Sequence, residues 1–181
     1  MRKDRTPNIN NRPKHRIDNP GYYFITSRTI DGQWFLQPEK YKTILFEIIK
    51  EKSEKFCFPL IAYAILNNHY HLIIDVKEPK EFIKFISQIN GASSRAINLA
   101  DYVYDRKIWW NYYEHFIRNE EDFFKHLNYI HQNPIKHGSA KDFGYKFSSY
   151  NAWVAKKGKK YLDHAFVRYP IIDFKTFNDD F

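Results

Sequence analysis

The sequence predicts an α+β domain: a ferredoxin-like βαββαβ antiparallel sheet with helices on one face and an extra C-terminal helix. Strand candidates rich in aromatic and β-branched residues alternate with amphipathic helical segments. Two strand candidates are separated only by an Asn-Asn turn, which is typical of a β-hairpin. The resulting order of strand, helix, two strands, helix and strand is that of split βαβ topology.

The first half of the chain supplies three strands and one helix. Residues 22–28 (YYFITSR) favour a first strand, because aromatic and β-branched side chains suit a pleated surface. Residues 39–55 place apolar side chains at helical spacing, with charges on the opposite face. Residues 58–66 and 69–76 are predicted as the second and third strands, joined by the turn at 67–68.

The second half adds two helices and one strand. We expect a helix over 78–102 with a break at Gly91, a strand over 105–116, and a helix over 118–134 that Pro134 stops. The last helix has a good N-cap and a negatively charged first turn, which its dipole favours: Asn119, Glu120, Glu121 and Asp122.

Composition divides the chain into three parts. Residues 1–20 are polar, basic and punctuated by proline, and are expected to form a flexible arm. Residues 21–153 form the domain, and 154–181 an extension to which the sequence assigns no role. We expect the segments 148–153 (SSYNAW) and 156–160 (KKGKK) to be loop and basic surface.

Charge and cysteine content limit the classes of partner and compartment. The chain has 181 residues and a formal net charge of +8, which favours a polyanion such as nucleic acid. A single cysteine, Cys57, allows no internal disulfide and fits a reducing compartment. The longest apolar run is too short to cross a bilayer, so we expect a cytoplasmic protein without membrane contact.

Two histidines on one strand are the first candidate site. Side chains at i and i+2 of a strand point to the same face, so His69 and His71 lie side by side and Tyr70 opposite. Two neutral imidazoles on a rigid backbone form half of a divalent-metal site. The alternative places one histidine in water and bonds the other to the backbone.

The helix that follows offers a second constellation. Tyr129 and Asn133 are one turn apart and share a stripe, with His126 close to it. The amide of Asn133 at the helix end is available to bind a ligand. The alternative for Tyr129 is an ordinary flank residue of an amphipathic helix, and residue chemistry alone favours that alternative.

Four segments together resemble one family. NHYHLII (68–74) is similar to the histidine signature of HUH endonucleases, and HLNYIHQNPIKHG (126–138) to the tyrosine segment of single-tyrosine transposases. WWNYYEHFIRNEEDF (109–123) and FSSYNAW (147–153) resemble elements before and after that segment. The nearest branch is the REP-associated tyrosine transposases, and the resemblance covers roughly residues 20–153.

The resemblance implies the chemistry. His69 and His71 would chelate Mg²⁺ or Mn²⁺, with Asn133 as a third ligand. Tyr129 would attack a phosphodiester of single-stranded DNA and leave a 5′-phosphotyrosine and a free 3′-OH. The implied substrate is a hairpin-forming repeat. The enzyme would be a monomer, or a homodimer in which the tyrosine helix of one chain serves the histidines of the other.

Basic side chains are the expected phosphate contacts, and the aromatic stretch 105–118 has the composition of a single-strand binding surface. The alternatives are solubilising charge and simple core packing. A further alternative for the whole chain is a catalytically silent binder of structured single-stranded DNA or RNA. The candidate DNA-binding residues are Arg2, Lys3, Arg5, Arg12, Lys14, Arg16, Arg106, Lys107, Arg118, Lys136, Lys156 and Lys157.

Overall fold

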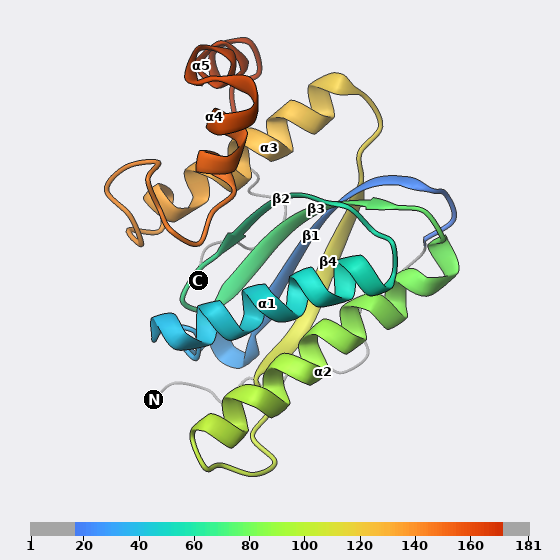
Figure 1. The fold of residues 1–181 in the computed structure, drawn as a ribbon, viewed down its shortest axis with the longest axis vertical. Coiled ribbons are helices and arrows are strands. Elements are labelled where there is room, and N and C mark those ends of the chain that lie inside the picture. Colours follow the sequence, from blue (N-terminus) through green and yellow to red (C-terminus); the bar gives the residue numbers. More distant parts are fainter. Residues whose placement is uncertain (1–16, 172–181) are drawn as a thin grey trace, which may run out of the picture.

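The structure is a computed structural model that describes residues 17–171 of the chain. The candidate contacts at residues 1–16 therefore lie outside the described residues, as does the end of the predicted extension. Figure 1 shows a sheet with helices beside it, and the helices of the last part of the chain grouped at one end of the molecule. The elements are β1 (Gly21–Thr29), α1 (Glu39–Lys55), β2 (Leu60–Ile65), β3 (His69–Val76), α2 (Phe82–Ala100), β4 (Trp109–Phe116), α3 (Glu120–Lys136), α4 (Tyr150–Lys157) and α5 (Lys159–Arg168).

The four strands form one sheet in the order β2-β3-β1-β4, and every neighbouring pair is antiparallel. This arrangement confirms the predicted fold class. The strand that carries the two histidines, β3, lies inside the sheet, so both of its edges are paired. Its backbone is therefore held from both sides, which fixes the direction of its side chains.

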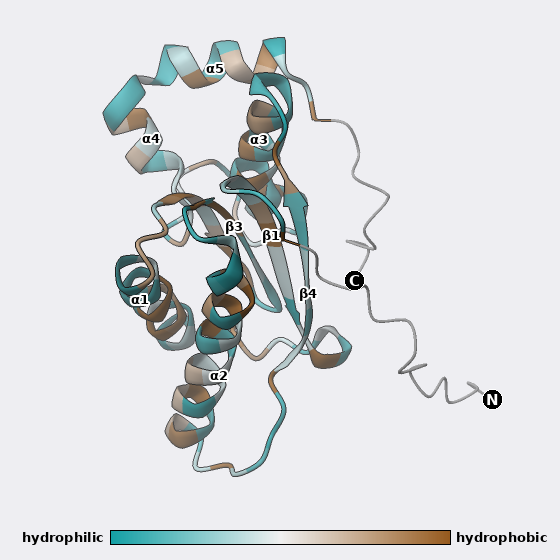
Figure 2. Cartoon of the chain, turned by 90° about the vertical axis from the view of Figure 1, so that its right-hand side faces the viewer, coloured by the Kyte–Doolittle hydropathy of each residue, from teal (hydrophilic) through white to brown (hydrophobic). Residues whose placement is uncertain are grey.

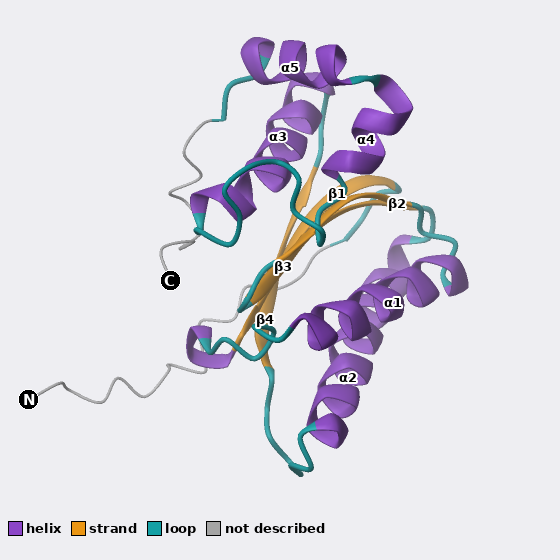
Figure 3. Cartoon of the chain, turned by 60° about the vertical axis from the view of Figure 1, so that its left-hand side comes forward, coloured by secondary structure: helices purple, strands orange, loops and turns teal. Residues whose placement is uncertain are grey.

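Side-chain alternation divides the core into two layers. Tyr23 and Ile25 of β1 pack with α1 and α2 on one face of the sheet. Phe24 of β1 packs with α3 on the other face, where the fully buried residues of β2 are Ala62 and Ala64. These small side chains leave room for α3 close to the sheet. Figure 3 shows α1 and α2 on one side and α3 on the other, and in Figure 2 both α1 and α2 carry teal and brown residues, as amphipathic helices do.

The ends of α3 have identifiable causes. The side chain of Asn119 accepts a hydrogen bond from the Asp122 backbone N–H, as an N-cap does. The prediction that Pro134 stops the helix was wrong, because α3 continues to Lys136. Pro134 lies in the last turn, where one lost hydrogen bond is tolerated. The helix ends where Gly138 adopts a left-handed φ of +65°, which glycine reaches without steric cost.

Three further boundaries differ from the sequence-based expectation. Gly91 does not interrupt α2, and β4 begins at Trp109, not at residue 105. The segments predicted as loop and basic surface form α4 and α5. The ring of Trp153 packs against the α3 core layer and its indole N–H donates to the Ile61 carbonyl, which holds α4 in place. Gly158, at φ +87°, separates the two helices.

No helix among residues 17–171 is long and apolar enough to span a bilayer.

Candidate active site

The structure places both histidine side chains on the face of the sheet that α3 covers. His71 lies opposite Thr26 of β1, and His69 lies opposite Arg28. The two imidazole centroids are 4.9 Å apart, with an interplanar angle of 74°. Both rings are buried, and Tyr70 belongs to the opposite core layer, as strand alternation predicts. The neighbouring strands thus hold the two rings side by side.

The hydrogen bonds around the rings indicate which nitrogens are bare. His69 Nδ1 lies 2.7 Å from Asn68 Oδ1, and His71 Nδ1 lies 2.7 Å from Thr26 Oγ1. An amide oxygen only accepts hydrogen bonds, so Nδ1 of His69 carries the proton and Nε2 keeps its lone pair. Nε2 of His71 is buried and has no hydrogen-bond partner within the described part of the chain.

Asn133 brings a third donor atom from α3. Its Oδ1 lies 3.1 Å from His69 Nε2, although both atoms are electron-pair donors when the imidazole is neutral. Two ligands at right angles around Mg²⁺, each about 2.1 Å away, are about 3.0 Å apart. The contact therefore has the spacing of neighbouring ligands. Together with the orphaned Nε2 of His71, it makes these three residues fit a divalent cation.

Burial keeps both imidazoles neutral. It lowers the pKa of His69 to about 3, assisted by the nearby His137, while Asn133 opposes the shift. Burial also lowers the pKa of His71 well below its ordinary value, and His69 and His137 add to the effect. A neutral imidazole is the form that binds a metal ion. Both rings are therefore in that form at neutral pH.

Tyr129 lies directly against this pair. Its ring centroid is 5.2 Å from that of His71 and 5.9 Å from that of Phe24, both edge to face. The residue is 3% exposed, and its hydroxyl is buried. The ammonium of Lys136 lies 5.7 Å from the centre of the ring. The phenol and the imidazoles of one chain are thus brought together, and the phenol is covered.

One residue of the site escaped the sequence analysis. The His137 ring lies 5.0 Å from the His69 ring, and it follows Asn133 by four residues. The signal was present, because Tyr129, Asn133 and His137 continue one stripe at successive helical turns. The helix was expected to end at Pro134, so His137 was not expected to continue the stripe.

A second cluster lies farther along the same face. His115 of β4 lies 2.9 Å from an Asp122 carboxylate oxygen, and His126 Nδ1 lies 3.0 Å from the other oxygen. Possible ligand atoms of these three side chains lie within 4.8 Å of one another. The cluster ties β4 to the first turns of α3. It connects to the histidine pair through Phe24, whose ring is 4.7 Å from His126 and 5.5 Å from His71.

Comparison with known proteins decides the family. A sequence model of the family described as IS200-like transposases matches residues 22–133, a range that begins in β1 and ends at Asn133. The chain belongs to this transposase family.

Two relatives extend this assignment. The chain is 30% identical over 139 residues to a REP-associated tyrosine transposase of Escherichia coli (strain K12), covering 75% of this chain and 80% of the relative. A solved structure of a REP-associated tyrosine transposase bound to a REP hairpin shares 26% identity and a TM-score of 0.69, covering 80% of this chain and 86% of that one. Both comparisons identify this chain as a transposase enzyme with the predicted fold.

The candidate DNA-binding cations of this transposase occupy different places. Lys136 is exposed on α3 beside the histidines and Tyr129. The guanidinium of Arg106 instead donates to Asn98 and Asp101, so it is engaged within its own loop. Three other cations lie exposed near the start of α3 and the end of α4, away from the histidine pair: Arg118, Lys156 and Lys157.

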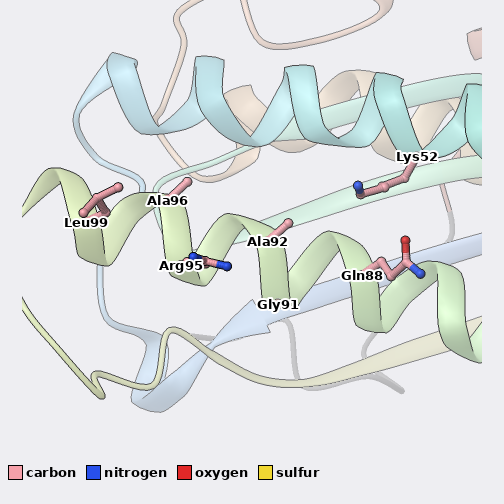
Figure 4. A pocket seen from close by; sticks show the side chains of 7 residues that line it. All are labelled: Lys52, Gln88, Gly91, Ala92, Arg95, Ala96 and Leu99. Carbon is pink, nitrogen blue, oxygen red and sulfur yellow. The ribbon is translucent and has the colours of Figure 1, made fainter.

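An open groove on the opposite side of the transposase does not belong to the site. Figure 4 shows it along α2, lined by Gly91, Ala92 and Ala96, with Lys52 reaching in from α1. Because α1 and α2 cover the face of the sheet that carries Tyr70, the groove and the histidine pair are separated by the sheet.

Proposed function

We propose that this transposase is a metal-dependent single-stranded DNA endonuclease and strand transferase with Tyr129 as its nucleophile. The proposal rests on one observation, which is that three potential metal ligands and a phenol lie close together. Nε2 of His69, Nε2 of His71 and Oδ1 of Asn133 converge beside the ring of Tyr129. The buried Nε2 of His71 has no hydrogen-bond partner among the described residues, and a metal ion at this point would supply one.

The three donors would hold Mg²⁺ or Mn²⁺, and the ion would polarise the phosphate oxygens and favour ionisation of the attacking phenol. A hard cation prefers oxygen ligands, so the donor set requires Asn133 and oxygens from the substrate or water in addition to two imidazoles. The Asn68 side chain accepts from Nδ1 of His69, and the Thr26 hydroxyl is hydrogen-bonded to Nδ1 of His71. Both contacts hold the rings with Nε2 directed into the site.

The proposed cleavage step exchanges one phosphoester bond for another. The phenol of Tyr129 loses its proton and its oxygen forms a bond to phosphorus. The bond from phosphorus to O3′ breaks, and the 3′ oxygen takes up a proton. The product is a 5′-phosphotyrosine with a free 3′-OH. Because the bond energy is conserved in the phosphotyrosine, the reverse attack by a 3′-OH joins strands without another energy source.

Burial of the phenol adds a requirement to this mechanism. The Tyr129 hydroxyl is not accessible in the described conformation, so DNA binding must be accompanied by opening of the site. Lys136 is exposed beside the ring, which suits it to meet the incoming phosphate. The relative bound to a REP hairpin supports a hairpin-forming repeat as the substrate of this chain. The exposed predicted cations, Lys107, Arg118, Lys156 and Lys157, would add salt-sensitive phosphate contacts.

The test is covalent capture. Incubation with a labelled single-stranded DNA hairpin and Mn²⁺ should give an adduct that survives denaturant, and Tyr129→Phe should abolish it while hairpin binding remains. Tyr113→Phe is the matched control, because Tyr113 lies on the same face of the sheet, opposite Thr26, and should still form the adduct. Adduct formation by Tyr129→Phe would move the nucleophile elsewhere. Hairpin binding with no adduct from the unaltered chain would identify a silent binder.

A further inference from the structure

The loop between α2 and β4, residues 101–108, displays two tyrosines to solvent. Tyr102 is 88% exposed and Tyr104 is 84% exposed, the highest values among the large apolar side chains of the described residues. Single exposed apolar residues need no explanation, but here Val103 between them is exposed as well. The loop lies at the lower end of the molecule in Figure 1, between the end of α2 and the start of β4.

Hydrogen bonds hold this loop in a defined shape. The Asn98 side chain donates to the Arg106 carbonyl at 2.7 Å and accepts from Arg106 Nε at 2.9 Å. The Val103 backbone N–H donates to the Asn98 carbonyl at 2.9 Å. Arg106 also pairs with Asp101, whose carboxylate accepts from the Tyr41 hydroxyl. The two tyrosines are therefore presented by a loop with fixed ends.

The backbone of the loop is unfavourable for the residues it carries. Tyr102 has φ +55° and Asp105 has φ +60°, a left-handed region that side chains rarely adopt. Tyr102 is the left-handed residue of the cap that ends α2: its N–H donates to the Leu99 carbonyl, and the N–H of Val103 donates to the Asn98 carbonyl. Glycine is the usual residue at this position of a helix cap, and here the position carries a tyrosine whose ring lies in solvent.

The loop leads to the end of the sheet that carries the histidine pair. The Ile30 backbone N–H donates to the Ile108 carbonyl, and the Thr29 N–H donates to the Asn68 carbonyl, next to His69. Neighbouring strands are about 4.8 Å apart, so the start of β4, two strands from β3, lies roughly 10 Å from His69. Trp34, which is 60% exposed, lies in the loop that follows β1 at this same end.

We propose that Tyr102 and Tyr104 stack on unpaired bases of the DNA strand that enters the site. This inference rests on the proposed function, because it takes single-stranded DNA as the substrate. Every base has a π-face, so two exposed phenol rings would hold a single strand without sequence preference. Lys107 of the same loop is exposed and lies 4.7 Å above the Trp110 ring, where it can contact a phosphate.

The experiment measures equilibrium binding without cleavage. In a Tyr129→Phe background and without divalent metal, a labelled hairpin with a single-stranded flank is titrated by fluorescence anisotropy. The double variant Tyr102→Ala/Tyr104→Ala should lose about tenfold in affinity per lost stack. Tyr102→Phe/Tyr104→Phe should bind as tightly as the parent, because phenylalanine retains the ring. Tyr161→Ala, an exposed tyrosine of α5, is the control and should bind like the parent.

Two further readouts separate stacking from charge and from self-association. The dependence of affinity on salt should be unchanged in the alanine double variant, since no phosphate contact is removed. 2-Aminopurine in the flank should be quenched by the parent and not by the double variant. Affinity within twofold of the parent would overturn the proposal. So would an alanine double variant that changes the sedimentation mass, because that result assigns the surface to a second copy of the chain. Both readouts measure binding and require no covalent adduct. Failure of the cleavage proposal would therefore be detected only in the separate adduct experiment.

Discussion

At the scale of single residues, the site depends on the protonation of two imidazoles. Asn68 and Thr26 occupy the Nδ1 atoms of His69 and His71, and burial disfavours a second proton on either ring. The Nε2 lone pairs therefore remain available at neutral pH. The same burial makes an empty site unfavourable, because a buried nitrogen without a partner loses its hydration and gains nothing in return.

Removal of one imidazole should weaken metal binding directly. His71→Ala removes a proposed ligand, so Mn²⁺ affinity measured by calorimetry should fall by at least about tenfold. His164→Ala removes an exposed imidazole of α5, outside both histidine clusters, and serves as the control, with an expected affinity close to that of the parent. Equal affinity in His71→Ala and the parent would contradict the ligand assignment.

Some features of the site could be predicted from the sequence at the scale of single residues, and others could not. Strand alternation was sufficient to place His69 and His71 together, because period-two geometry depends only on the local backbone. The helical stripe could have indicated His137, but neither the closeness of its ring to His69 nor the burial of Tyr129 follows from the sequence. Both depend on how closely α3 approaches the sheet, and that distance is set by side chains on other strands.

At the scale of elements, α3 is the part that assembles the site. Its first turn is fixed to β4 through Asp122, and its middle packs over the small side chains of β2. Burial alone would raise the pKa of Asp122, but the Arg118 backbone N–H and His115 hold it below its ordinary value. The carboxylate is therefore charged and hydrogen-bonded at neutral pH, and it fixes the direction in which the helix starts.

Loss of that charge should destabilise the fold. Asp122→Asn keeps the shape of the side chain but replaces a carboxylate oxygen with an amide, so a hydrogen bond to His115 or to the Arg118 N–H is lost. The free energy of unfolding should fall by about 1–3 kcal/mol, measured by urea denaturation. Asp163→Asn breaks an exposed pair with Lys159 and should leave the midpoint nearly unchanged. Equal effects of the two changes would refute the role assigned to Asp122.

The elements that the sequence missed share a physical reason. The segments of α4 and α5 are short and rich in lysine, so they carry little helical periodicity of their own. Their helical structure depends on tertiary contacts, such as that of Trp153 with the layer under α3. The long helices α1 and α2 were predicted because their amphipathic pattern extends over several turns.

At the scale of the whole molecule, the α+β fold class followed from the sequence because the order of predicted strands and helices leaves few topologies. The structure adds that the tyrosine helix and the histidines of one chain are already in contact, so one chain can supply both halves of the proposed site. The sequence had left that arrangement open.

Buried neutral histidines should make the whole fold sensitive to acid. Burial lowers the pKa of His131 to about 3, while an unfolded histidine titrates near 6.5. As the pH falls below 6.5, the unfolded chain gains a proton that the folded chain refuses, so stability decreases until about pH 3. The metal-free His131→Gln variant should lose stability less steeply than the parent over this range, by about 1.4 kcal/mol per pH unit. If the free energies of unfolding of the variant and the parent, measured by chemical denaturation, changed equally with pH, His131 would not be a buried neutral residue.

The most direct measurement of the central claim locates the covalent bond. The adduct formed with a single-stranded hairpin and Mn²⁺ is digested with protease and nuclease, and the nucleotide-bearing peptide is sequenced by mass spectrometry. The chain has 14 tyrosines, so the modified peptide distinguishes Tyr129 from the other possible nucleophiles of this type. The account predicts the modification on Tyr129 in the peptide that contains Asn133. A phosphonucleotide on any other residue would contradict it.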